Sequence, residues 1–261
     1  MSPVHRNEGE ITAVGRAAEI LKQFRQSRGT LSAAALTRRT GLPKTTVYRM
    51  LADLVRVGLL ERSGNDYRPG LMLFEIGEAV PRQRSLREAA KLHLSTLHEA
   101  TGGNVGLALL DGFEVIHLEV FRGQEGPLVP QNTGGRWPAH ASASGKAILA
   151  FSDLDDIQLP STLRRFTERT IVDHAELVAE LQRVRKRGVA FDYQEAFPGI
   201  VSVAAPVFGP DEDALGAISL AGVAGRLDLA RLDAAVRTTA LSVSRELVLA
   251  RSVVRPVLKR R

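Results

Sequence analysis

Residues 31–62, LSAAALTRRTGLPKTTVYRMLADLVRVGLLER, contain two short amphipathic segments separated by a glycine and a proline. Ser32 can cap the first segment, because a serine oxygen accepts a hydrogen bond from the free N–H groups at a helix start. Gly41 is suited to end this helix, and Pro43 fits the first turn of the next one, where its missing N–H costs nothing. Two helices joined in this way are typical of a helix-turn-helix.

The flanking sequence extends the motif on both sides. A helix is expected from Ile11 until Gly29, with apolar residues recurring at helical spacing along one face. Downstream, residues 59–62 and 67–68 enclose the turn-forming Ser63-Gly64-Asn65-Asp66 and predict a β-hairpin. A hairpin placed directly after the second helix of the motif is a wing, so the first eighty residues predict a winged DNA-binding domain.

Basic and hydroxyl side chains gather on this predicted domain. Between residues 38 and 56 five basic residues accompany a single acid, Asp53. A basic helix alone more often indicates a solvated face than a DNA contact, but the adjacent wing favours DNA. Such groups can contact phosphates and base edges in a major groove. We therefore expect DNA contacts from Arg38, Lys44, Thr45, Thr46, Tyr48, Arg49, Arg62 and Arg68.

The composition is that of a globular protein with one large or two small domains. The chain has 261 residues and a mass of 28.3 kDa; 44% of its residues are hydrophobic and 25% charged. Zero cysteines exclude disulfides and thiolate metal sites. The net charge of +6 is uneven: residues 1–80 hold 12 basic and 8 acidic residues, and the last seven residues hold four basic ones. The positive charge is thus concentrated on the predicted DNA-binding domain and the tail.

The sequence shows no targeting or membrane-spanning segment. Glu10 and Arg16 interrupt the apolar residues near the start, which leaves no uncharged stretch of the roughly 7–15 residues that a secretory signal needs. No apolar run approaches the roughly 18 residues of a membrane helix. We expect a cytoplasmic protein with no membrane partner.

The rest of the chain predicts a connector and a second domain of mixed α and β structure. A short helix is expected over 71–79 and a linker helix over 81–103, which ends at Gly102-Gly103. The Asp111-Gly112 turn predicts a hairpin of strands 104–110 and 114–120. Further strands are expected over 127–131, 189–192, 201–208 and 214–221, and further helices over 144–151, 174–187 and 229–251. This gives an α+β fold divided into residues 1–80, 81–103 and 104–261.

These residues resemble a known family. The run VGRAAEIL, then LSAAALTRRTGLPKTTVYRMLADLVRVGLLER, then YRPGLMLFEIG is similar to the N-terminal domain of the IclR family of bacterial transcriptional regulators. The resemblance continues through residues 138–147, 191–202 and 217–222 and covers most of residues 11–250. It implies a winged helix-turn-helix repressor or activator. Its affinity for operator DNA would be set by a small molecule bound in a GAF-like, profilin-like C-terminal domain.

The resemblance also implies the residues of an effector pocket. Effector contacts are expected at Ser142, Ala143, Ser144, Asp192, Ser202 and Ser219. Small residues entering a helix let a ligand approach the backbone, and the positive end of the helix dipole favours a carboxylate. Ser202 stands where the family often has Cys, Ala221 replaces a serine, Tyr193 and Gln194 replace acids, and Trp137 replaces an aliphatic residue. These departures argue against assuming glyoxylate or pyruvate as the effector. Ser202 and Ser219 are also compatible with a bond to a neighbouring strand, and Trp137 with a core position.

Signatures of an enzyme are absent from the sequence. The SASGK stretch lacks the glycine and the Ser/Thr of a phosphate loop, and the six histidines are dispersed. We therefore expect no enzyme activity, no cofactor and no metal. The predicted partners are double-stranded operator DNA, a small-molecule effector and a second copy of the chain in a homodimer or a dimer of dimers. The effector is expected to be a carboxylate, an organic or aromatic acid. A sensor or enzyme whose basic head docks a protein is the alternative.

Overall fold

The computed structural model describes residues 12–27, 29–123, 129–154, 157 and 159–254. The chain divides into two compact units, Met1–Pro81 and Arg82–Arg261. None of the described helices is both long enough and apolar enough to cross a membrane.

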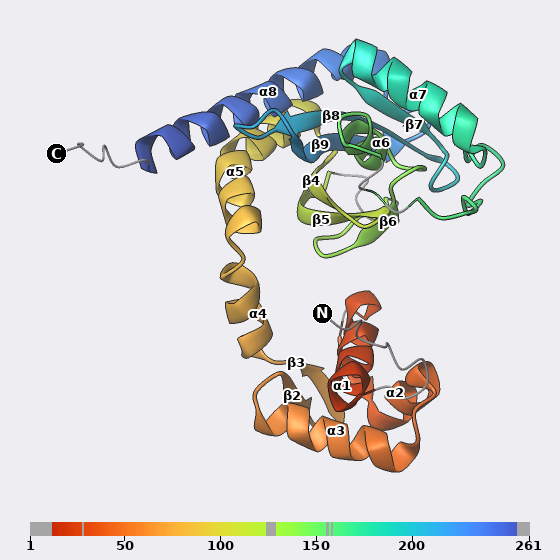
Figure 1. Ribbon diagram of the computed structural model, residues 1–261, viewed down its shortest axis with the longest axis vertical. Helices are drawn as coiled ribbons and strands as arrows, with labels where there is room; N and C mark the ends of the chain where they lie inside the picture. The colour runs from red at the N-terminus through yellow and green to blue at the C-terminus, as the bar shows by residue number, and fades with distance from the viewer. Residues whose placement is uncertain (1–11, 28, 124–128, 155–156, 158, 255–261) are drawn as a thin grey trace, which may run out of the picture. The chain divides into compact units, whose positions relative to one another are not determined.

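The first unit is a winged helix-turn-helix (Figure 1). Its elements are α1 (Ala13–Lys22), the 3-10 helix η1 (Gln23–Gln26), β1 (Leu31–Ser32), α2 (Ala33–Thr40), α3 (Lys44–Arg56), β2 (Leu60–Ser63), β3 (Asp66–Pro69) and α4 (Leu71–Glu78). One hydrophobic cluster joins the three helices to the wing and includes Ile20, Leu36, Val47, Leu51 and Leu60. The apolar faces expected from the sequence thus pack on one another.

The ends of the helix-turn-helix follow the expected capping chemistry. The Ser32 Oγ accepts a hydrogen bond from the Ala35 N–H at 3.1 Å, and Gly41 ends α2 with a φ of 66°. This positive φ requires little energy only for glycine. Pro43 precedes α3 as its N-cap instead of lying in its first turn. The two-residue strand β1, too short to be recognised in the sequence, pairs with β3 and completes a three-stranded sheet in the order β1-β3-β2.

The second unit is an antiparallel sheet covered by helices (Figure 1). Its elements are α5 (Pro81–Thr101), β4 (Asn104–Asp111), β5 (Glu114–Phe121), β6 (Arg136–Pro138), α6 (Ala143–Leu149), α7 (His174–Arg187), β7 (Ala190–Tyr193), β8 (Ile200–Phe208), β9 (Ala214–Val223) and α8 (Leu229–Val254). The strand order is β6-β5-β4-β9-β8-β7. Together with the first unit this is the expected α+β fold.

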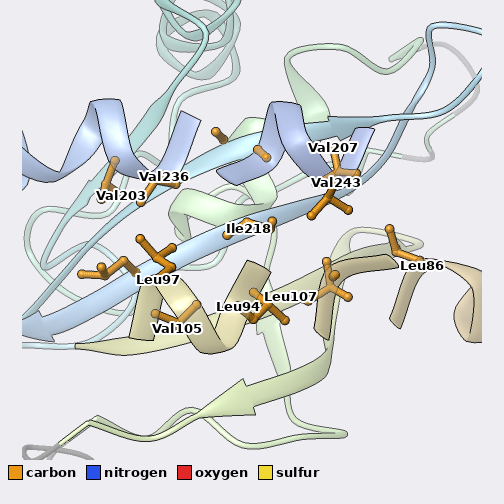
Figure 2. Close-up of a cluster of buried hydrophobic side chains, with 14 of the residues drawn as sticks. Leu86, Leu94, Leu97, Val105, Leu107, Val203, Val207, Ile218, Val236 and Val243 are labelled. Carbon is orange, nitrogen blue, oxygen red and sulfur yellow. The ribbon is translucent and has the colours of Figure 1, made fainter. Parts of the chain in front are cut away.

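Alternate residues of each strand face opposite layers of the second unit. On one face, side chains of α5 and α8 pack on the sheet; Figure 2 shows Leu94 and Leu97 of α5 and Val236 and Val243 of α8 converging near Ile218 of β9. The segment expected as a linker helix therefore lies largely in the core of this unit. On the other face, α6 and α7 pack against small strand residues in a second cluster. The pocket described below lies on this second face.

One strand prediction is wrong in its position. Residues 127–128 lie outside the described residues, and 129–131 form no strand. The edge of the sheet is instead β6, which pairs with β5 so that Trp137 lies opposite Val115. Backbone bonds from the His117 N–H to the Gly135 carbonyl, and from the Gly134 N–H to the His117 carbonyl, already hold the chain beside β5. The turn through these two glycines therefore fixes which residues become the edge strand.

Candidate functional site

The exposed side of α3 carries the polar residues expected to contact DNA. Lys44, Thr45, Tyr48 and Arg49 are exposed, and Thr46 is half-buried. The Lys44 ammonium lies 5.8 Å from the centre of the Tyr48 ring. Within the described chain, neither Lys44 nor Arg49 forms an ion pair, so both charges are available to an anionic partner. Arg38 is exposed in the last turn of α2.

The wing presents its two arginines differently. Arg62 and Arg68 are both exposed, on β2 and β3. The Arg68 guanidinium forms a 2.9 Å ion pair with Glu61, and this contact lowers the pKa of the Glu61 carboxyl. Arg62 lies over the ring of Tyr67 and forms no ion pair within the part of the chain that the structure describes. The Arg62 charge is therefore free for a phosphate, whereas a phosphate at Arg68 competes with Glu61.

In the second unit a small cavity gathers most of the residues expected to hold an effector. Its volume is about 30 Å³, enough for a few atoms, since a single water needs about 10–15 Å³. Five of the six expected residues line it, namely Ser142, Ser144, Asp192, Ser202 and Ser219. Ala143 is fully buried in the cluster between α6 and the sheet and does not line the cavity.

The register of the sheet explains why residues so distant in the sequence meet. Ser202 of β8 lies opposite Asp192 of β7 on one side and Ala221 of β9 on the other. Ser219 is two residues before Ala221 and therefore points to the same face, where it lies opposite Gly106 of β4. A one-residue slip of any strand would turn its polar side chain into the opposite hydrophobic layer.

Helix α6 closes the cavity and is held tightly in place. Ser142 caps it, with its Oγ accepting from the Gly145 N–H at 3.2 Å and donating to the Pro138 carbonyl at 2.9 Å. A Cβ on Gly145 would lie 2.2 Å from the Ala139 carbonyl oxygen, so only glycine fits. The small residues of this stretch are thus required by helix packing, in addition to any approach by a ligand.

A buried ion pair ties α6 to the turn after β7. The Lys146 ammonium donates to both carboxylate oxygens of Glu195 at 2.6 Å, and the Lys146 side chain is only 1% exposed. The Glu195 N–H in turn donates to the Asp192 Oδ1 at 2.7 Å. Burial raises the pKa of Glu195, and the adjacent ammonium opposes that change. This chain of contacts connects the helix at the cavity with the carboxyl group in its wall.

Burial favours the uncharged forms of the two titratable groups in the cavity, Asp192 and His117. Burial raises the pKa of Asp192 to about 7; the Glu195 N–H acts in the opposite direction, while the Glu195 charge adds to the increase. Burial lowers the pKa of His117 to about 4, partly offset by the nearby Gly135 carbonyl, so His117 is uncharged at neutral pH. No Lys or Arg is among the described residues that line the cavity. Its walls therefore offer hydrogen bonds in place of fixed positive charge.

The sequence did not reveal four of the lining residues. Val129, Gln131, Ile200 and His117 complete the cavity. Val129 and Ile200 form a small apolar cluster with Ala221, which makes one wall hydrophobic. Trp137, noted in the sequence as a departure from the family pattern, also lines the cavity. The only signal for His117 was its position two residues after Val115, which places both side chains on the same face of β5.

A larger hollow of about 500 Å³ lies elsewhere on this unit, between the end of α6 and α7. Its one arginine, Arg185, already donates to the Ala150 carbonyl at 2.6 Å and lies over the ring of Phe151. None of the expected effector residues lines it. The smaller cavity, where polar side chains from five elements converge, is the better candidate for recognising a molecule.

Comparison with known proteins agrees with this arrangement. Residues 13–64 match the family model described as the IclR helix-turn-helix domain, and residues 79–245 match that of the bacterial transcriptional regulator IclR C-terminal domain. The chain belongs to the IclR family. It is therefore a transcriptional regulator with a helix-turn-helix DNA-binding domain and a C-terminal ligand-binding domain.

Individual relatives support the family assignment over nearly the whole chain. The HTH-type transcriptional regulator BhcR of Paracoccus denitrificans is 34% identical over 246 residues, which cover 92% of this chain and 88% of the relative. The crystal structure of the Thermotoga maritima IclR matches with a TM-score of 0.71 at 28% identity, covering 92% of this chain and all of that one. An IclR homolog from Microbacterium hydrocarbonoxydans, crystallised with 4-hydroxybenzoate, has the same fold with a TM-score of 0.81 at 24% identity. It covers 90% of this chain and 99% of that one.

Proposed function

We propose that this regulator binds operator DNA through the start of α3 and the wing. The contacts are assigned to Arg38, Lys44, Thr45, Thr46, Tyr48, Arg49, Arg62 and Arg68. The observation that supports this most directly is the unpaired, exposed state of Lys44 and Arg49 on a helix whose opposite side is buried. A groove-binding helix needs such an arrangement, because phosphate contacts position it and base contacts give specificity.

The protein acts as a homodimer or a dimer of dimers in this proposal. Specific protein–DNA interfaces bury on the order of 1,000–2,500 Å² of protein surface. A single small winged helix-turn-helix unit buries less than this. Sedimentation velocity at micromolar concentration should therefore show no monomer. A monomer that still bound its operator tightly would contradict the proposed assembly. Whether binding represses or activates transcription depends on where the operator lies.

The effector is a small molecule bearing a carboxylate. Support comes from the convergence of Ser142, Ser144, Ser202 and Ser219 on one cavity with Asp192. Among the described residues no cation lines this cavity, so the hydroxyls of Ser144 and Ser219 and a protonated Asp192 would supply the hydrogen bonds to the ligand anion. The Ser142 hydroxyl donates to the Pro138 carbonyl and the Ser202 hydroxyl to the Asp192 Oδ2. The apolar wall at Val129 and Ile200 would contact its carbon skeleton. We expect the ligand to be bound and released unchanged, in the cytoplasm.

A fluorescence titration tests the effector site directly. Trp137 lines the cavity and is the only tryptophan of the chain, so its emission reports on this site alone. The panel contains acetate, propionate, glyoxylate, pyruvate, glycolate, lactate, benzoate and 4-hydroxybenzoate. A compound that shifts the emission should also change operator affinity in a gel-shift titration, and Ser202→Ala should weaken both effects. If no acid shifts the emission or the melting temperature, the carboxylate proposal fails.

A salt titration separates DNA binding from docking of a protein by the basic head. A head that neutralises several phosphates releases their counterions, so the logarithm of its DNA affinity falls steeply with the logarithm of salt concentration. Binding to promoter DNA that is weak and nearly independent of salt would favour the protein-docking alternative.

A further inference from the structure

Three polar side chains meet at one end of the cavity, above a glycine. They are His117 of β5, Ser219 of β9 and Gln131 from the segment before β6. A Cβ on Gly106 would lie 2.6 Å from the Gln131 Nε2, 3.2 Å from the His117 ring and 3.3 Å from the Ser219 Oγ. Only glycine at this position of β4 leaves room for the three groups to approach one another.

Two of these side chains hold buried polar atoms that the protein does not satisfy. His117 is 3% exposed and Gln131 is 5% exposed. The His117 Nδ1 and the Gln131 Oε1 have no hydrogen-bond partner among the described residues. The other end of the Gln131 amide reaches only the Ser219 Oγ, at a long 3.5 Å. Most buried polar groups in folded proteins are paired, because an unpaired one loses its hydrogen bonds to water without replacement.

Another buried amide of the same unit shows what a structural role looks like. Asn104 is 2% exposed, yet its Oδ1 accepts from the Gly123 N–H at 3.2 Å and its Nδ2 donates to the Ala221 carbonyl at 3.5 Å. Both ends of Asn104 therefore bridge backbone groups of neighbouring segments. The nitrogens of the two amides donate over the same distance, but the Gln131 Oε1 has no partner among the described residues, although Gln131 is similarly buried and lines the cavity.

We propose that Gln131 and His117 form a second polar subsite of the effector pocket, which recognises a hydroxyl group on the ligand. The inference rests on the proposed effector function and adds the chemical class of the effector, a hydroxylated carboxylic acid. A hydroxyl group matches because its hydrogen can be donated to the Gln131 Oε1 or to the unprotonated ring nitrogen of an uncharged His117, both of which are acceptors. The carboxylate then lies toward Asp192 and the serines, at the other polar part of the cavity.

A stability measurement tests the subsite without knowledge of the ligand. Residues kept for binding at the expense of stability can be replaced by apolar residues of similar size without loss. Gln131→Met should leave the melting temperature of the free protein unchanged or raise it by about 3 °C. The control Asn104→Leu removes a paired amide and should lower the melting temperature by at least that much. A loss for Gln131→Met as large as that for Asn104→Leu would show that the amide is structural and would overturn the proposal.

Pairs of acids that differ by one hydroxyl test what the subsite recognises. Trp137 fluorescence compares glycolate with acetate and lactate with propionate, which are among the acids of the panel with the fewest atoms. The wild-type protein should prefer the hydroxylated member of at least one pair by tenfold or more, because a site built around a hydroxyl leaves its own groups unpaired with the other acid. Gln131→Met and His117→Phe should each remove this preference and retain the affinity for the unhydroxylated acid.

The outcomes separate this inference from the function on which it rests. If acids bind but Gln131→Met keeps the full preference for the hydroxyl, the subsite is wrong and the acid-sensing proposal stands. If no acid binds, the acid-sensing proposal fails and the assignment of a hydroxylated acid fails with it; the melting temperatures then decide whether the Gln131 amide is structural. A preference that is lost only in the Gln131 and His117 variants, and not in Asn104→Leu, supports the subsite.

Discussion

Lys44, Tyr48 and Arg49 extend into solvent from a helix whose other side is buried, whereas the polar side chains of the effector cavity are themselves buried. Among the described residues the charges of Lys44 and Arg49 are unpaired, and water screens them until a partner arrives. In the cavity, burial shifts Asp192 and His117 toward their uncharged forms, and the one full ion pair, between Lys146 and Glu195, lies behind the wall. The first surface suits an extended polyanion, and the second suits a small molecule recognised by hydrogen bonds.

This contrast has an energetic consequence. Substitutions on α3 should change DNA affinity with little effect on folding, because exposed side chains away from the core contribute little to stability. Substitutions at cavity residues that are hydrogen-bonded within the fold, such as Ser142 and Asp192, should change folding and binding together. Gln131 and His117, whose buried polar atoms are unpaired among the described residues, are the exceptions. The four predictions below test this contrast, from the largest expected effect to the smallest.

The largest effect is expected from breaking the buried ion pair. Lys146→Met leaves the Glu195 carboxylate buried without its partner, which typically costs about 3–5 kcal/mol. We expect a fall in melting temperature on the order of 10 °C. Lys22→Met is the matched control in the first unit, because Lys22 forms an exposed pair with Glu19, and exposed pairs contribute under about 1 kcal/mol. Equal losses for the two variants in a thermal unfolding experiment would refute the distinction between the two regions.

A double substitution separates the charge from the packing. Lys146→Met combined with Glu195→Leu removes both charges and should recover most of the lost stability, because apolar residues of similar size often replace a buried ion pair without loss. If the double variant is less stable than Lys146→Met, the side-chain fit around the pair matters more than its charge.

Recognition residues on α3 should show the opposite behaviour. Arg49→Ala should weaken operator binding by at least tenfold, in line with about 1–3 kcal/mol for an arginine that contacts a base. Lys44→Ala should weaken binding to all sequences and reduce the slope of the salt dependence by about 1, as expected for a phosphate contact. Both are measured by gel-shift or fluorescence anisotropy titration, and both should keep the wild-type melting temperature.

The control for the DNA contacts is Arg231→Ala, which removes an exposed arginine of the second unit. It should leave both operator affinity and the salt slope unchanged. If Arg49→Ala and Lys44→Ala behave like this control, α3 is not the recognition helix.

How far the sequence predicts each region follows from the range of the interactions involved. The head depends on local chemistry: Ser32 and Gly41 bound α2 because capping involves residues only a few positions apart. The same holds for α7, whose expected bounds His174–Arg187 are confirmed and which lies between the Asp173 cap and Gly188. The basic residues expected to contact DNA are likewise exposed in the structure, as their charge predicts.

The cavity depends instead on pairings that no short stretch of sequence contains. Lys146 and Glu195 are 49 positions apart, and Gln131 meets Ser219 across 88 positions. The serines were predicted because they lie in segments that resemble the family's motifs, whereas Gln131 and His117 lie outside those segments. Ala143 illustrates the opposite error, because its neighbours line the cavity while its own side chain is packed into the core.

The pH dependence of effector binding should be confined to the cavity. A carboxylate ligand accepts a hydrogen bond from Asp192 only while that group is protonated, and its pKa is about 7. Affinity for an acid effector should therefore be constant well below pH 7 and fall about tenfold per pH unit above it. Asp192→Asn should remove this dependence, since an amide carries no titrating proton. An affinity that increases with pH would mean that the ligand donates hydrogen bonds to an ionised Asp192, as an amine would.

The smallest effects are expected at two serines that cap helices in the two regions. Ser32 caps α2, and Ser142 caps α6 at the cavity. Replacing a capping serine by alanine costs about 1 kcal/mol, so Ser32→Ala and Ser142→Ala should each lower the melting temperature by about 3 °C. Ser142→Ala should also weaken effector binding, because the same hydroxyl lines the cavity, whereas Ser32→Ala should leave it unchanged. Equal effector affinities in the two variants would mean that the Ser142 hydroxyl stabilises α6 without contributing to ligand binding. In this part of the cavity wall, as on α3, different residues would then contribute to folding and to binding.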